Sequence, residues 1–192
     1  MKPHEFLDAK LLWKIFYANH TFKHAKAAAL HIVEKNLTDS DPLFHPLLVS
    51  VYVLYARPFT RADGVGNLDE KYVPNQYRSA HKAMLQHRNK VYAHRDAEGF
   101  VVEDLGNVNQ VRAINDGEKI ILMAANLHTR AGAMAGIIEL CEALEKKTDG
   151  HIGELWAKYN GQIPRKIGEF LLNIADEKTD MWIPQKPLFL GV

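Results

Sequence analysis

The sequence predicts a mainly all-α fold, a helical bundle of four to five helices with a small β-hairpin insert. Long stretches without proline or glycine, and apolar residues at helical spacing, both favour helices. The composition, 47% hydrophobic and 24% charged, is typical of a globular protein with a real core. At 192 residues, we expect one domain that spans residues 1–192.

The first half of the chain predicts three helices. The first covers about residues 4–35, which contain neither proline nor glycine. The second begins near Asp41 and Pro42, a capping residue followed by a first-turn proline, and ends at Pro58. A polar loop over residues 60–76 then leads to a third helix from Tyr77 to about Arg95.

The second half predicts a hairpin and further helices. The hairpin covers about residues 100–114, around Leu105 and Gly106. A long fourth helix is expected from Asn115 or Asp116 to about Lys147, with a short helix among the glycines of residues 150–161. A last helix is expected from Pro164, because the apolar residues 167, 170, 171 and 174 have helical spacing. The apolar tail, residues 181–192, should pack on the body or on a partner.

Charge and cysteine content restrict the function and the compartment. The formal net charge is only +1, so any contact with nucleic acid must come from a local patch. Cys141 is the only cysteine, which excludes an internal disulfide and indicates a reducing compartment. The polar start is unlike a signal peptide, and polar residues interrupt the longest apolar region, so we expect a cytoplasmic protein with no membrane contact.

Polar chemistry is concentrated in the segment HRNKVYAHRD, residues 87–96. Histidine transfers protons near neutral pH, and arginine offers a charged fork of donors to phosphate oxygens. With no carboxylate pair nearby, this set suits cleavage of a phosphodiester without a metal or another cofactor. On a straight helix, however, Arg88 lies about 120° and Asn89 about 140° around the axis from His94. A bend in the helix, or a second subunit, would have to bring them together.

Arg88 and Asn89, followed after four residues by His94, resemble the signature of the HEPN superfamily. The string RNKVYAHRD is similar to the branch of abortive-infection (AbiU-type) proteins. The resemblance implies a helical bundle, metal-independent endoribonuclease activity and a homodimer in which two motifs form one cleft. It assigns phosphate binding to Arg88, proton transfer to His94 and a supporting role to Asn89. The implied partners are RNA, a second copy of the chain and an antitoxin or regulatory protein.

Other residues near the motif have weaker assignments. RNA-binding roles are expected for cationic and imidazole side chains on the same helix, namely Lys90, Arg95, His87, Arg78 and Lys82. Two other interpretations stay open. The motif can be a charged helix end on the surface, or the chain can be a non-catalytic HEPN-like helical dimer that binds RNA or a protein.

A stripe on the first helix contains His20, His24 and His31, extended by Trp13 and Tyr17. His20 and His24 have the i, i+4 spacing that can chelate zinc. No cysteine or acidic ligand accompanies them in the sequence pattern, so a packing or subunit face is the preferred interpretation. A metal enzyme that uses this pair remains a third hypothesis.

Overall fold

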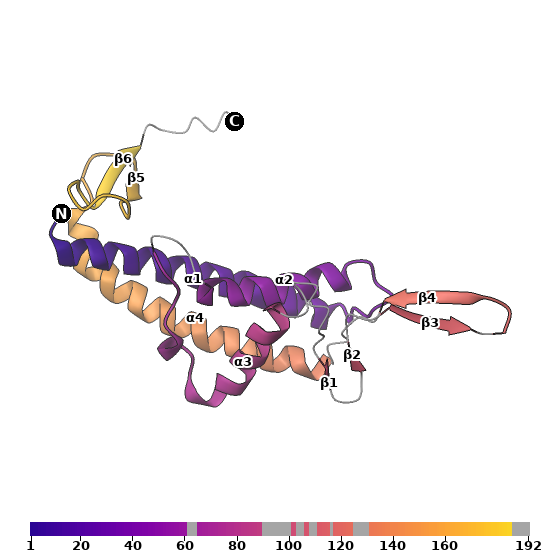
Figure 1. Cartoon of the computed structure of the whole chain (residues 1–192). Helices are drawn as coiled ribbons and strands as arrows, with labels where there is room; N and C mark the ends of the chain where they lie inside the picture. The colour runs from indigo at the N-terminus through magenta and orange to yellow at the C-terminus, as the bar shows by residue number, and fades with distance from the viewer. Residues whose placement is uncertain are drawn as a thin grey trace.

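Two long helices, α1 (Pro3–Glu34) and α4 (Ala131–Tyr159), lie side by side and form the axis of the molecule (Figure 1). Residues 8, 19 and 26 of α1 contact residues 158, 148 and 145 of α4, so the two helices are antiparallel. The computed structural model describes residues 1–60, 65–89, 101–102, 106–107, 111–115, 117–124 and 131–185. The predicted mainly helical fold and the first predicted helix are confirmed.

Helix α2 (Phe44–Ala56) packs along α1 and begins shortly after Asp41 and Pro42, which were predicted as its cap and first-turn proline but precede the helix. The Asp41 carboxylate accepts a hydrogen bond from the backbone N–H of Leu43 at 2.8 Å, which satisfies a donor near the start of the helix. Pro46 lies in the first turn, where its missing N–H costs little. Pro58 follows in a short 3-10 helix, Arg57–Phe59.

Helix α3 (Arg78–His87) packs against α2 and contacts α4. It follows two 3-10 helices, Glu70–Tyr72 and Asn75–Tyr77, within the region predicted to be a loop. The predicted helix extends to about residue 95, but residues 90–100 lie outside the described residues. The described chain therefore supports only the first part of the predicted helix, residues 78–87.

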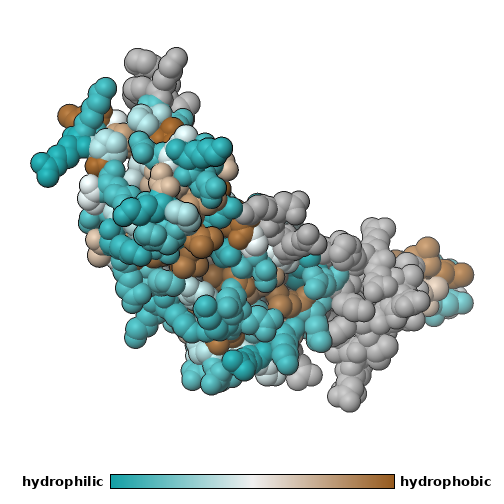
Figure 2. Space-filling model, turned by 60° about the vertical axis from the view of Figure 1, so that its left-hand side comes forward, coloured by the Kyte–Doolittle hydropathy of each residue, from teal (hydrophilic) through white to brown (hydrophobic). Residues whose placement is uncertain are grey.

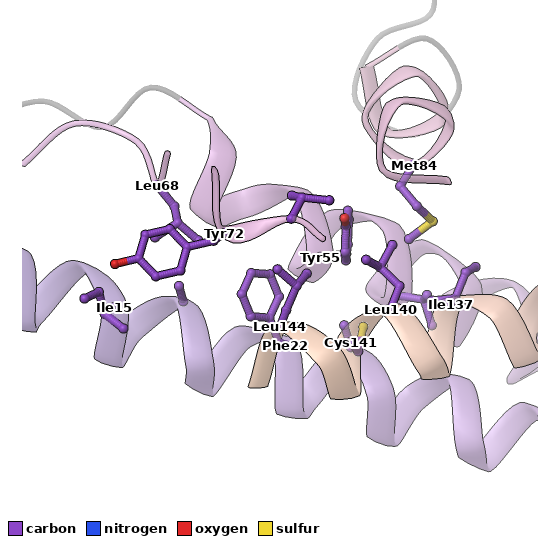
Figure 3. Close-up of a cluster of buried hydrophobic side chains, with 14 of the residues drawn as sticks. Ile15, Phe22, Tyr55, Leu68, Tyr72, Met84, Ile137, Leu140, Cys141 and Leu144 are labelled. Atoms are coloured by element: carbon purple, nitrogen blue, oxygen red, sulfur yellow. The ribbon is translucent and has the colours of Figure 1, made fainter. Parts of the chain in front are cut away.

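The core lies where α1, α2 and α4 meet, and Met84 of α3 is directed toward it (Figure 3). Phe22, Tyr55 and Leu144 have no exposed surface. Burial of one such large apolar side chain stabilises a protein by roughly 1.5–3 kcal/mol. The apolar packing between the helices therefore holds α3, which carries the start of the motif, against the bundle.

Three two-stranded antiparallel sheets occur in the described part of the chain. The pairs are β1 (Val101–Val102) with β2 (Gly106–Asn107), β3 (Val111–Asn115) with β4 (Ile120–Ala124), and β5 (Glu169–Leu172) with β6 (Trp182–Gln185). The first pair lies within the predicted hairpin insert, but residues 111–114 of that insert form β3 and pair with β4 instead. The second projects from the end of the bundle (Figure 1).

The prediction for the fourth helix is wrong at both ends. Residues 120–124, expected to be helical, form β4, because this run pairs with β3 across a turn that Gly117 makes with a φ of +94°. The helix begins at Ala131 and continues through Gly150 and Gly153 to Tyr159. The predicted short helix over 150–161 is therefore part of α4, since its buried Leu155 and Tyr159 outweigh the low helix propensity of the two glycines.

The predicted last helix, from Pro164, is also wrong. Residues 169–172 form β5, and Ile167, which the helical pattern placed on a core face, is fully exposed. The side chain of Asn173 accepts hydrogen bonds from the backbone N–H groups of Ala175 and Asp176, both at 3.1 Å. These bonds favour a turn after β5 instead of a helix.

The predicted apolar tail is described as far as Gln185, and residues 186–192 lie outside the described residues. Met181 is buried, and Trp182 packs on the core, in agreement with the expected packing on the body. Within the described segments, no helix has both the length and the apolar character needed to cross a membrane.

Candidate functional site

Helix α3 is fixed to α2 by a buried polar contact. The Tyr55 hydroxyl lies 2.8 Å from Nδ1 of His81, and both side chains are essentially inaccessible to solvent. The Phe59 ring meets the His81 ring edge to face, with centroids 4.5 Å apart. Burial lowers the pKa of His81 despite the opposing effect of Glu70. His81 is therefore neutral at pH 7, and its Nδ1 can accept a hydrogen bond from the Tyr55 hydroxyl.

His87 lies two turns further along α3 and stacks on Tyr52 of α2. The ring centroids are 5.2 Å apart, and the planes differ by only 10°. Burial lowers the pKa of His87, so the imidazole is uncharged near neutral pH. A neutral imidazole in a fixed orientation can accept a proton from a reacting hydroxyl group.

Arg88 and Asn89, the first two motif residues, follow the last residue of α3 and are joined through their side chains. Nη1 of Arg88 donates a hydrogen bond to Oδ1 of Asn89 at 2.8 Å. The Arg88 side chain is half-buried, whereas Asn89 is exposed. Nε of Arg88 is buried and has no hydrogen-bond partner in the described part of the chain. Buried N–H donors are normally paired, so the unpaired Nε–H of this cation suits an anion as its partner.

Arg78 and Lys82 are both exposed and lie one turn apart on α3. On a helix they lie about 80° and 120° around the axis from Arg88, so they face a different side. The described chain therefore does not bring these two cations together with Arg88. Lys90, His94 and Arg95, the other residues of the predicted site, lie outside the described residues.

The predicted histidine stripe brings two imidazoles together. Nε2 of His20 and Nε2 of His24 are 3.0 Å apart, as the i, i+4 spacing predicts. His31 is exposed further along α1. Among the described residues, no group of three or more histidine, cysteine or acidic side chains is placed to hold a metal ion.

The aromatic supports of the site are the part that the motif did not reveal. Tyr52 and Tyr55 are three residues apart on α2, so both can face α3. One holds His87 by stacking and the other holds His81 by a hydrogen bond. Their spacing was the available signal, but it also fits ordinary core packing.

Comparison with protein-family models, with curated proteins and with solved structures finds no match for this chain. The residues and their geometry therefore carry the functional argument.

Proposed function

We propose that the chain is a metal-independent endoribonuclease of HEPN-like type, of the toxin or abortive-infection kind. The observation that carries the proposal is the state of Arg88. Its guanidinium group is held by Asn89, yet its buried Nε has no partner in the described chain. A guanidinium placed in this way suits the charge that develops on a phosphate during cleavage.

In the proposed reaction, His94 removes the proton from a ribose 2′-hydroxyl group. The 2′-oxygen attacks the adjacent phosphorus, and the bond from phosphorus to the 5′-oxygen breaks. The leaving 5′-oxygen takes up a proton, from the protonated His94 or from water, and the products are a 2′,3′-cyclic phosphate and a free 5′-hydroxyl. Arg88 stabilises the crowded phosphate, and Asn89 keeps the guanidinium oriented.

His87 supports the proposal from the described side of the motif. Its low pKa and its stacking on Tyr52 make it a second candidate for proton transfer beside Arg88. A homodimer remains part of the proposal, because a second chain is one way to bring Arg88 and His94 to the same phosphate. An antitoxin or regulatory partner is also part of the proposal, because uncontrolled RNA cleavage is harmful to a cell.

The test is cleavage of a mixed-sequence RNA in excess chelator. We expect the wild-type protein to leave cyclic phosphate ends. Arg88→Ala should lower the rate roughly 10²–10³-fold, as loss of an oxyanion-stabilising donor does. His94→Ala should lower it roughly 10²–10⁴-fold. Arg165→Ala and His31→Ala remove exposed side chains of the same types and are the matched controls.

Equal cleavage by all variants would mean a contaminating nuclease and would remove the support for catalysis.

The second candidate function is a non-catalytic helical dimer that binds RNA or a protein. It is favoured by the exposed aliphatic side chains of the β3–β4 hairpin, Ile114, Ile120, Ile121 and Leu122, which give the projecting tip in Figure 2 its hydrophobic surface. An inert wild-type protein that forms dimers through this hairpin would favour that candidate.

A further inference from the structure

A cavity of about 320 Å³ lies between α1 and the chain that follows α2. Its size falls within the range of small-molecule sites, about 300–1,000 Å³. The cavity has an aromatic wall and two cationic side chains, and it includes none of the motif residues. The lining residues are Trp13, Lys14, Tyr17, Arg57, Pro58, Thr60 and Gly66.

The aromatic wall is a pair of stacked rings on α1. The rings of Trp13 and Tyr17 are parallel to within 1°, with centroids 5.2 Å apart. Both side chains are half-buried, so part of each ring remains accessible from the cavity. Such a pair offers a platform on which another planar ring can stack.

Two cations line the same cavity. The guanidinium carbon of Arg57 lies 5.2 Å from the centre of the Tyr17 ring. The ammonium group of Lys14 lies beside Gly66, only 3.7 Å from the position that a Cβ atom would take there. Gly66 has a φ of +76°, which an L side chain rarely adopts, so this wall has no side chain to cover the ammonium.

The cations are not neutralised by neighbouring carboxylates in the described chain, where neither Arg57 nor Lys14 forms an ion pair. The nearby Asp69 carboxylate is held by Lys71, accepting from its backbone N–H at 2.8 Å and lying 3.4 Å from its ammonium group. The pKa of Asp69 is lowered first by the backbone hydrogen bond from Lys71 and last by the charge of Lys14. The cavity therefore combines positive charge with an aromatic surface.

We propose that this cavity binds a nucleotide unit, with its base stacked against the Trp13 ring of the aromatic pair and its phosphate held by Arg57 and Lys14. An apolar ligand would leave both cations unused, and a bare phosphate would leave the aromatic pair unused. The nucleotide can be free or part of a single strand, because the recognition chemistry is the same. The site lies apart from Arg88 and does not depend on the proposed nuclease activity.

Tryptophan fluorescence of the full chain tests this proposal. The protein is titrated at low ionic strength with adenosine monophosphate, adenosine, inorganic phosphate and a short oligodeoxyadenylate. The last of these lacks the 2′-hydroxyl and stays intact even if the protein cleaves RNA. We expect the monophosphate or the oligomer to quench the fluorescence, and Trp13→Phe to remove this response. Trp156→Phe, which changes a tryptophan on α4, should retain it.

Arg57→Gln and Lys14→Gln, which change surface cations, should each weaken binding on the order of fivefold to tenfold, as expected for a charge-assisted hydrogen bond that is partly exposed. Lys35→Gln, at an exposed position just after α1, should leave it unchanged. If only the oligomer binds, the natural ligand is a nucleotide unit within a single strand. If the monophosphate binds as tightly as the oligomer, the ligand is a free nucleotide. The proposal is overturned if no ligand quenches the fluorescence, if Trp13→Phe keeps the response, or if phosphate competes as well as the monophosphate.

Discussion

Replacement of Tyr55 by phenylalanine tests whether the buried bond to His81 holds α3 in place. The substitution removes the hydroxyl group 2.8 Å from Nδ1 of His81 and changes little else. Because Tyr55 is 0% exposed and His81 is 2% exposed, water cannot replace the lost partner without opening the core. The variant should then carry an unsatisfied acceptor at the base of the helix that leads to Arg88.

The expected cost follows from that burial. A buried polar group left without its partner destabilises a protein by about 1–3 kcal/mol. For a chain of this length, each kcal/mol lowers the melting temperature by roughly 2–4 °C. A loss of about 2 kcal/mol should therefore lower the melting temperature by about 4–8 °C.

Urea denaturation at pH 7.5 measures the free energy of unfolding directly. Tyr77→Phe, which removes the hydroxyl of a tyrosine at the core edge, is the matched control and should cost little. A double-mutant cycle with His81→Phe should give a coupling energy on the order of 1–2 kcal/mol. A cost below about 0.5 kcal/mol for Tyr55→Phe, or additive effects in the cycle, would refute the reasoning.

Three further predictions concern the whole bundle. Burial lowers the pKa values of His81 and His87, so the unfolded chain binds more protons than the folded chain. The free energy of unfolding should therefore be at its full value above the unfolded pKa of about 6.5 and should fall as the pH drops below it. Urea titrations over that pH range would show this fall. Asn19→Ala should cost about 2–3 kcal/mol, because its amide is buried and donates to Thr148 at 2.9 Å, whereas the exposed Asn75→Ala should not change the urea midpoint. Burial raises the pKa of the Cys141 thiol to about 12, so a thiol reagent should label it in urea but not in the folded protein; rapid labelling of the native chain would contradict its burial.

The parts of the fold that the sequence predicted well are those with strong local signals. The first helix has no helix breaker over about thirty residues, and Asp41 with Pro42 marks the approach to α2. The mainly helical class of the fold follows from such segments. The i, i+4 spacing also predicted that His20 and His24 would face each other.

The errors arose where tertiary packing decides the structure. Apolar residues 120–124 fit a helix or a strand equally well, and the pairing with β3 decides for the strand. Gly150 and Gly153 are poor helix formers, yet packing against α1 keeps them in α4. For the site, the motif predicted that Arg88 and Asn89 act together, whereas the spacing of the two tyrosines that hold α3 could not be told from ordinary core packing.

The buried amide of Asn19 also restricts how the two long helices can slide along each other. Apolar stripes tolerate a shift of one helical turn, since one aliphatic contact replaces another. The Asn19 amide donates to Thr148, to Asp149 and to the backbone carbonyl of Glu145, and a shifted register would remove both side-chain partners. Together with the ion pairs Lys26–Glu145 and Asp8–Lys158, this buried contact therefore sets the register in which α4 packs against α1.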